Sequence, residues 1–255
     1  MGGWKRGEAE FDADRTALVV MHAWECGDRE LYPGWHRAVE YFPRARDILR
    51  TCLPKVLKSA RDAGLTVFHV SIPGPYLSRY PGYALAESLA SPSDCWADEP
   101  RACPDPFTEE IQRFRSCNIF PGAHNKDDIA RGFAALDFPE EAKPLGNEGI
   151  AVSTRQLAAL CRQKDINHLI YTGFAINGCL MTSPGGIPDM ARLGWLCSVI
   201  SQAVTAIENR ESAEAEWGKQ MALWFVSLLY GCVYDDSDFI RAMDTLNERS
   251  LINED

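Results

Sequence analysis

The sequence predicts an α/β protein built on a mostly parallel sheet. Short apolar runs are typical of strands covered on both faces, and the longer stretches between them have the periodicity of amphipathic helices. The two kinds of segment alternate along the chain. Alternating strands and helices favour parallel strand pairs joined by helical crossovers.

The first such unit lies in the N-terminal third of the chain. Thr16–Met21 (TALVVM) is the first expected strand, and Thr66–Ser71 (TVFHVS) is the second. The stretch Ala45–Ala63 between them has helical periodicity, and Pro54 inside it predicts a kink or two abutting helices. Gly64 is expected to end the helix. A crossover of this length makes the two strands parallel.

The next segment, residues 73–148, is predicted to be a long insertion within a single domain that spans residues 1–255. Its first part, to about Asp105, is rich in Pro, Gly, Ser and Asp, which favours a lid or an oligomer contact. Glu109–Arg115 and Asp127–Leu136 are expected to form short helices.

Regular alternation returns after residue 150. Strands are expected at His168–Thr172, Leu196–Ile200 and Gly231–Tyr234. Helices are expected at Ser153–Lys164, Gly186–Leu193, Glu211–Tyr230 and Asp236–Leu246. Ser153 or Thr154 would cap the first of these helices.

Charge and hydropathy disfavour two classes of partner. The net charge is −10, and the basic residues form no cluster that would bind phosphates, so nucleic acid is not an expected partner. No apolar run reaches the length of a membrane span, and the first residues lack the apolar core of a secretory signal. We therefore expect a cytoplasmic protein that acts on a small molecule.

The nine cysteines indicate neither a zinc site nor a disulfide framework. Their number is odd, and no pair has CxxC spacing. Several fall inside apolar strands or helices, where a thiol acts as a small hydrophobe. We expect reduced cysteines, no metal and no cofactor.

One cysteine stands in a different setting. Cys179 lies in the stretch Gly173–Leu193, after an expected strand and a short loop, where the next helix should begin. In parallel sheets the ligand site lies beyond the carboxyl ends of the strands. Backbone N–H groups and the helix dipole at such a junction lower a thiol pKa and can stabilise an oxyanion. The alternative is a buried structural cysteine.

The pattern strand–G–F–A–x–N–x–C–L, followed by a helix, a glycine and a strand, resembles the isochorismatase-like hydrolases. The resemblance covers roughly residues 14–72 and 145–245. It implies a Rossmann-like three-layer α/β/α sandwich with a largely parallel six-stranded sheet. It also implies hydrolysis of a small amide or related C–N (or vinyl ether) substrate by a cysteine nucleophile, through a thioester-type mechanism.

The resemblance places the nucleophile at Cys179. Asn177 stands where many members have Asp. The resemblance further implies a cis peptide bond between Ala175 and Ile176, and an oxyanion hole formed by the loop Ala175, Ile176, Asn177 and Gly178.

Two other positions depart from the family pattern. The family has an Asp directly after the first strand, and His22 stands there. The family Lys would fall near residue 145, and Lys143 is the nearest candidate. We expect His22 to replace the Asp as base and to pair with Cys179, with Lys143 as the third catalytic residue. The alternatives are a hydrogen-bonded histidine at a strand end and a solvated lysine.

Four residues are predicted to line the substrate pocket. Trp24 and Phe174 would supply apolar walls, and Glu25 and Glu148 would supply carboxylates. Glu208, on the loop after a later strand, is a further candidate carboxylate. Each glutamate could equally be an ordinary exposed residue.

The aromatic residues of the long C-terminal helix, Trp217, Trp224 and Phe225, favour a core or subunit contact, and we expect a homo-oligomer. Two rival functions remain. One is a catalytically inactive protein of the same fold that serves as a small-molecule-binding or scaffold subunit. The other, a nucleotide-binding oxidoreductase, is disfavoured because no G-x-G-x-x-G follows the first strand.

Overall fold

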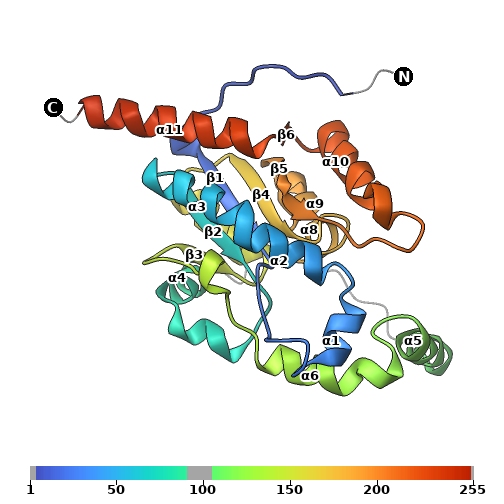
Figure 1. The fold of residues 1–255 in the computed structure, drawn as a ribbon. Helices are drawn as coiled ribbons and strands as arrows, with labels where there is room; N and C mark the ends of the chain where they lie inside the picture. The colour runs from blue at the N-terminus through green and yellow to red at the C-terminus, as the bar shows by residue number, and fades with distance from the viewer. Residues whose placement is uncertain (1–3, 91–104, 254–255) are drawn as a thin grey trace.

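A computed structural model describes residues 4–90 and 105–253 of the chain. Its centre is a six-stranded, all-parallel sheet in the order β3-β2-β1-β4-β5-β6 (Figure 1). The strands are β1 (Thr16–Met21), β2 (Thr66–Val70), β3 (Gly149–Ala151), β4 (His168–Phe174), β5 (Leu196–Thr205) and β6 (Val233–Tyr234). The predicted parallel sheet is confirmed.

Helices cover both faces of this sheet (Figure 1). On one face lie α2 (Phe42–Thr51), α3 (Leu53–Asp62) and α11 (Asp236–Asn253). On the other lie α4 (Pro81–Leu89), α7 (Thr154–Gln163), α8 (Cys179–Thr182), α9 (Ile187–Arg192) and α10 (Trp217–Leu229). The remaining helices are α1 (Pro33–Ala38), α5 (Pro106–Asn118) and α6 (Lys126–Ala134). The three-layer sandwich is thus confirmed.

Strand β1 shows why the central strands read as continuous apolar runs. All six of its residues are buried. Ala17, Val19 and Met21 pack into the core on one face of the sheet, whereas Leu18 and Val20 pack into the core on the other. Successive strand residues point to opposite faces, so a strand covered on both sides has no face exposed to solvent.

The first crossover contains two abutting helices around Pro54 rather than one kinked helix, which is one of the two arrangements that the sequence predicted. Helix α2 ends at Thr51 and α3 begins at Leu53, which puts Pro54 in the first turn of α3, where its missing N–H costs nothing. Gly64 follows α3 with φ +72°, the left-handed conformation of a C-cap glycine.

Several boundaries differ from the prediction. Strands β4 and β5 continue to Phe174 and Thr205, beyond their expected ends. Helix α10 begins only at Trp217, because Glu216 before it is left-handed at φ +48°. Strand β3 was not predicted, since three residues are too short for a periodic pattern.

The segment 73–148 contributes to the fold on both sides of the gap in the described residues. Helix α4 packs against β3 and α7 through the fully buried Ala86, while α6 packs against α1. Its predicted helices form as α5 and α6. Cys95, Trp96 and Cys103 lie outside the described residues. Whether this segment acts as a lid remains a prediction.

Within residues 4–90 and 105–253, every cysteine is a free thiol. A search of the same ranges found no helix with both the length and the apolarity that a membrane crossing demands.

The two central strands meet too closely for any side chain at one position. Gly173 pairs with Met21 and has φ +112°, and a Cβ built on it would lie 1.8 Å from the Met21 carbonyl oxygen. We expect Gly173→Ala to lower the free energy of unfolding by about 3 kcal/mol or more, measured by urea denaturation.

Gly194 provides a matched control for this substitution. It has a similar φ of +101°, but a Cβ there would meet no atom within 4 Å. Gly194→Ala should therefore cost only about 1 kcal/mol of backbone strain. Equal losses in the two variants would contradict a steric origin.

Candidate active site

Cys179 lies at the carboxyl edge of the sheet, near its centre. Strand β4 ends at Phe174, a four-residue loop follows, and Cys179 is the first residue of α8. The neighbouring strand of β4 is β1, from which the sheet continues to β2 and β3 in one direction and through β4 to β5 and β6 in the other. This is the topological switch point of the sheet, where open α/β sheets hold their ligands.

The loop before Cys179 presents two free backbone donors. The cis peptide bond lies between Phe174 and Ala175, one residue earlier than predicted, directly where β4 ends. Ile176 N–H donates to Thr205 O at 2.8 Å, and Gly178 N–H donates to Ala175 O at 3.1 Å. These two are therefore not free for an oxyanion. The N–H groups of Asn177 and Cys179 have no acceptor within the described part of the chain.

The helix dipole contributes little at this junction. Helix α8 spans only Cys179–Thr182, so few peptide units are aligned behind the thiol. Cys179 itself is half-buried. The local environment thus depends on individual N–H groups rather than on a macrodipole, which corrects one basis of the sequence prediction.

The Asn177 side chain fastens this loop to the loop after β5. Its Nδ2 donates to Ile207 O and its Oδ1 accepts from Ile207 N, both at 2.8 Å. Because both ends of the amide are engaged, its side chain positions the loop and leaves only its backbone N–H for a ligand.

Glu208 binds the first turn of α10 rather than facing a substrate pocket. Its carboxylate accepts hydrogen bonds from Gly218 N and Lys219 N, both at 3.0 Å, and from Ser212 Oγ at 2.5 Å. Burial opposes its ionisation, but these hydrogen bonds outweigh burial and lower the Glu208 pKa. Carboxylates are favourable ligands for the free N–H groups of a helix start.

Helix α2 is tied to the same loop on the other side. Arg44 donates from Nε to Thr205 Oγ1 at 3.1 Å and from Nη2 to Ala206 O at 3.0 Å. Glu40 Oε1 accepts both from Arg44 Nη2 at 2.7 Å and from Glu208 N at 2.6 Å. The end of β5 is therefore held from two helices.

His22 follows β1 in an unusual conformation. Its φ is +53°, which is rare for a residue other than glycine, and its N–H donates to Val70 O at 2.8 Å. The side chain is 5% exposed, and burial lowers its pKa to about 4. The imidazole is therefore neutral near pH 7 and provides no positive charge to a thiolate.

The expected pair of His22 and Cys179 is not formed. No hydrogen bond joins the His22 ring to Cys179 or to any other residue the structure describes. A Cys–His pair requires such contact, at least in the reacting state. The structure places both residues at the same sheet edge, but it does not supply the activated arrangement.

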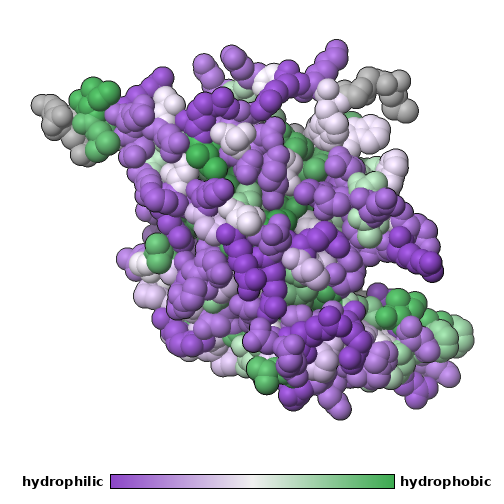
Figure 2. Space-filling view, in the orientation of Figure 1, coloured by the Kyte–Doolittle hydropathy of each residue, from purple (hydrophilic) through white to green (hydrophobic). Residues whose placement is uncertain are grey.

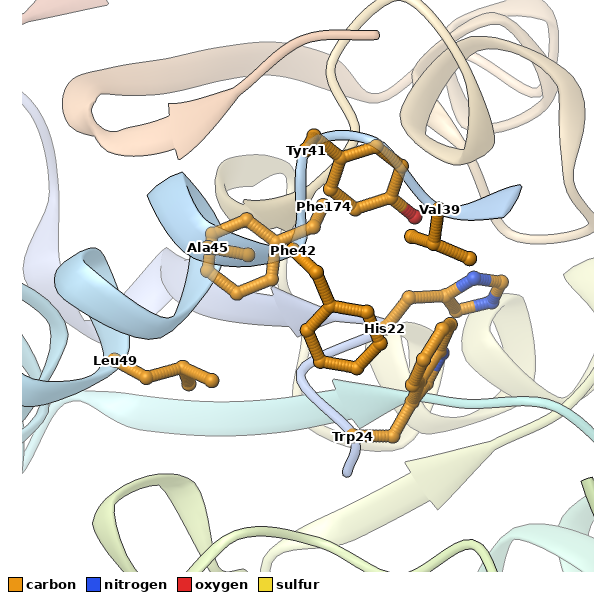
Figure 3. Close-up of a pocket in the computed structure, with 8 residues that line it drawn as sticks. All are labelled: His22, Trp24, Val39, Tyr41, Phe42, Ala45, Leu49 and Phe174. Atoms are coloured by element: carbon orange, nitrogen blue, oxygen red, sulfur yellow. The ribbon is translucent and has the colours of Figure 1, made fainter. Parts of the chain in front are cut away.

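A small apolar pocket opens beside His22 (Figure 3). Its cavity volume is about 10 Å³, room for roughly one water, and its walls come from α2, the end of β4, the residues after β1 and the segment before α2. The lining residues are His22, Trp24, Val39, Tyr41, Phe42, Ala45, Leu49 and Phe174. Trp24 and Phe174 were predicted to line a pocket. Trp24 Nε1 is buried without an acceptor among the described residues.

Tyr41 was not singled out in the sequence. Burial raises its pKa above the usual value, and negative charge at Cys179 acts in the same direction, which places the phenol near the nucleophile candidate. Its ring also lines the pocket, and its hydroxyl points towards the side where His22 lies (Figure 3). No sequence signal links Tyr41 to Cys179, because only the fold brings these distant positions together.

Lys143 and Glu148 lie at the opposite edge of the sheet, which corrects both assignments. Glu148 directly precedes β3, so it lies at the amino edge, where it binds Arg61 Nε at 2.7 Å and His69 Nε2 at 2.9 Å. Arg61 also donates to Lys143 O, while Lys143 Nζ pairs with Glu140 at 2.6 Å. Neither residue can reach a substrate at Cys179.

Glu25 is also occupied by structural contacts. Its carboxylate accepts from Arg46 at 2.7 Å, and its backbone forms an isolated bridge with Asp137. It does not line the pocket beside His22. Of the predicted pocket residues, only Trp24 and Phe174 are therefore found there. A search of the described ranges for His, Cys, Asp and Glu found no group able to hold a metal ion.

Solved structures of similar shape identify the fold. A cysteine hydrolase from Pseudomonas syringae pv. phaseolicola has a TM-score of 0.58 and 16% identity, over 94% of this chain and 97% of that one. A putative isochorismatase from Burkholderia xenovorans has a TM-score of 0.53 and 16% identity, over 91% and 88%. A putative hydrolase of the isochorismatase family from Chromobacterium violaceum has a TM-score of 0.52 and 15% identity, over 94% and 100%.

The chain therefore has the isochorismatase-like hydrolase fold, as the sequence pattern indicated. No family model matches the sequence, and no curated protein matches it either.

The buried His22 predicts a loss of stability in acid. The imidazole titrates near pH 6.5 in the unfolded chain and at about 4 in the folded protein. Between these values the unfolded state binds more protons, so the free energy of unfolding falls as the pH drops and is unaffected by this group above about pH 7. His22→Asn, which tolerates a left-handed backbone, should reduce the decline between pH 7.5 and 5.0 by about 2 kcal/mol.

Urea unfolding of both proteins at the two pH values measures this difference. His69 and His168 are also buried with lowered pKa values. Both histidines are present in the parent and in the variant, so their contribution to the free energy of unfolding is the same in the two proteins and does not affect the difference. An equal acid-induced decline in the variant and the parent would contradict a neutral, buried His22.

Proposed function

We propose that the chain is a cysteine hydrolase of small amides or related C–N compounds, with Cys179 as nucleophile. The observation that carries the proposal is the position of Cys179 at the switch point, next to the free N–H groups of Asn177 and Cys179. A thiol nucleophile and backbone donors for an oxyanion are two of the elements that acyl transfer uses. The hydrolase fold supports the same reaction class.

The proposed reaction has two steps. The Cys179 sulfur attacks the carbonyl carbon, and the oxyanion that develops is held by the two backbone N–H groups. The C–N bond breaks, the amine leaves with a proton, and a thioester forms on Cys179. Water then attacks the thioester, which releases the acid and returns the thiol.

Proton transfer would fall to His22. A neutral imidazole can accept the thiol proton, but a pKa of about 4 makes it a weak base. Catalysis would therefore rely more on the backbone donors than on the base. This favours substrates whose leaving group departs easily.

The walls of this pocket favour a substrate with an apolar part. The cavity volume of about 10 Å³ means that the pocket admits at most a small apolar group of that substrate. Val39, Phe42 and Leu49 supply apolar walls, while Trp24 Nε1 offers a hydrogen bond to an acceptor atom.

A second candidate function is a non-catalytic protein of the same fold that binds a small molecule. Two observations favour it: Lys143 lies at the opposite edge of the sheet, and His22 makes no hydrogen bond to Cys179 among the residues described. Thiol reactivity and turnover separate the two functions.

We expect Cys179 to react with iodoacetamide at pH 6.5 at least about tenfold faster than Cys232, the exposed cysteine that serves as internal control. Peptide mass spectrometry measures both rates. In a panel of small amides, substrates should leave a transient acyl adduct on Cys179, and Cys179→Ser should lower hydrolysis by at least about a thousandfold.

The alternative makes the opposite prediction. If Cys179 reacts no faster than Cys232 and no amide in the panel is hydrolysed, the nucleophile hypothesis is wrong and the binding function is preferred. Hydrolysis that survives in Cys179→Ser would exclude Cys179 as the nucleophile.

A further inference from the structure

Helix α10 has an apolar outer face with no partner among residues 4–90 and 105–253. Its inner face packs on the sheet through Ala222, Leu223 and Val226. On the outer face, large apolar side chains remain 45–65% exposed. They are Trp217, Met221, Trp224, Phe225, Leu228 and Leu229, and we call them the α10 face. In Figure 1 this helix lies at the periphery of the molecule.

The spacing of the α10 face fits another helix. Trp217, Met221, Trp224 and Leu228 follow one another at intervals of four, three and four residues. This is the spacing of a coiled-coil seam, in which each side chain inserts between side chains of a facing helix. The face therefore has the pattern of a helix–helix contact.

The area of the α10 face matches what a stable dimer needs. The exposed fractions of its six side chains correspond to roughly 700–800 Å², which exceeds the largest apolar patch of a typical monomer. It is also about the area that one partner buries in a standard stable interface, roughly 800 Å².

Charge does not oppose a second copy of the chain at the α10 face. The chain carries a net charge of −10, so two copies repel each other over most of their surfaces. Lys219 is the sole charged residue of α10, and it pairs with Glu216 on the same chain. The α10 face is thus a neutral surface on which two acidic copies can meet.

We propose that α10 packs antiparallel against α10 of a second copy in a twofold-symmetric dimer. Trp224 would lie close to the twofold axis, and Trp217 of one copy would pack near Leu228 of the other. A twofold dimer uses the same face on both copies, as a self-complementary stripe requires. The antiparallel arrangement also aligns the two helix dipoles favourably.

A second apolar stripe, on α5, is the natural comparison. Phe107, Ile111 and Phe114 are 51–71% exposed, and Figure 2 shows hydrophobic atoms over α5 at the lower right. Ile119 and Phe120, 71% and 53% exposed, continue the apolar surface beyond the end of α5, and α5 begins close to the undescribed residues 91–104. The stripe on α5 therefore serves as the control surface.

The dimer would also steady the loop that carries Cys179. The first turn of α10 holds Gly218, whose Cβ, if present, would lie 2.9 Å from Glu208 Oε2 and 3.0 Å from Asn177 Nδ2. Pairing of α10 fixes this turn and, through Asn177, the loop. This consequence rests on the proposed hydrolase function, whereas the dimer itself does not.

Light scattering coupled to size exclusion tests the dimer directly. We expect the unmodified protein to have twice the 28.4 kDa chain mass at about 10–100 μM. Trp224→Glu should weaken the dimer at least about a hundredfold and yield monomer, with an unchanged circular dichroism spectrum, because 45% of the Trp224 surface is exposed within one chain. Phe114→Glu on α5 should stay dimeric.

Leu228→Lys is a second variant on the same face and should also yield monomer. The proposal is overturned if the unmodified protein is monomeric, if Trp224→Glu and Leu228→Lys both fold and remain dimeric, or if only Phe114→Glu dissociates. Because the readout is mass, failure of the hydrolase hypothesis would leave this result unchanged.

Discussion

The close approach of β1 and β4 governs the rest of the structure. The Met21 carbonyl occupies the space that a side chain at residue 173 would need, so glycine is required and the two strands stay in contact up to their carboxyl ends. After β1 the chain leaves the sheet at His22, which has a left-handed backbone conformation. After β4 the chain leaves the sheet through the loop that leads to Cys179. The pocket and the thiol both lie where these two turns separate.

Predictions of element type and order agreed with the structure, whereas several element boundaries did not. Continuous apolar runs gave strands, Pro54 gave two abutting helices, and Cys179 followed β4 at the expected edge. Predictions that depended on distant partners did not. The residue number of Lys143 indicated nearness to a family position, but its contact with Arg61 places it at the other edge of the sheet. Burial of His22 and nearness of Tyr41 arise only from tertiary packing.

The histidine and the carboxylates beside the candidate site are either neutral or already paired. The imidazole is neutral, and the nearby carboxylates of Glu40 and Glu208 are engaged by Arg44 and by backbone N–H groups. What faces a ligand is therefore apolar side chains and a few unpaired donors. Under the proposed function, such a site would favour small neutral substrates with a hydrogen-bond acceptor, because a charged substrate would lose its hydration without gaining a counter-ion.

Gly218 allows the first turn of α10 to lie close to Glu208 and to Asn177, which hold the loop that carries Cys179. With no side chain at this position, the backbone of α10 rests directly against the groups that hold the nucleophile loop. Fraying of the first turn of α10 would therefore loosen contacts that hold this loop. The order of the loop that carries Cys179 thus depends in part on the end of a surface helix that lies further along the chain.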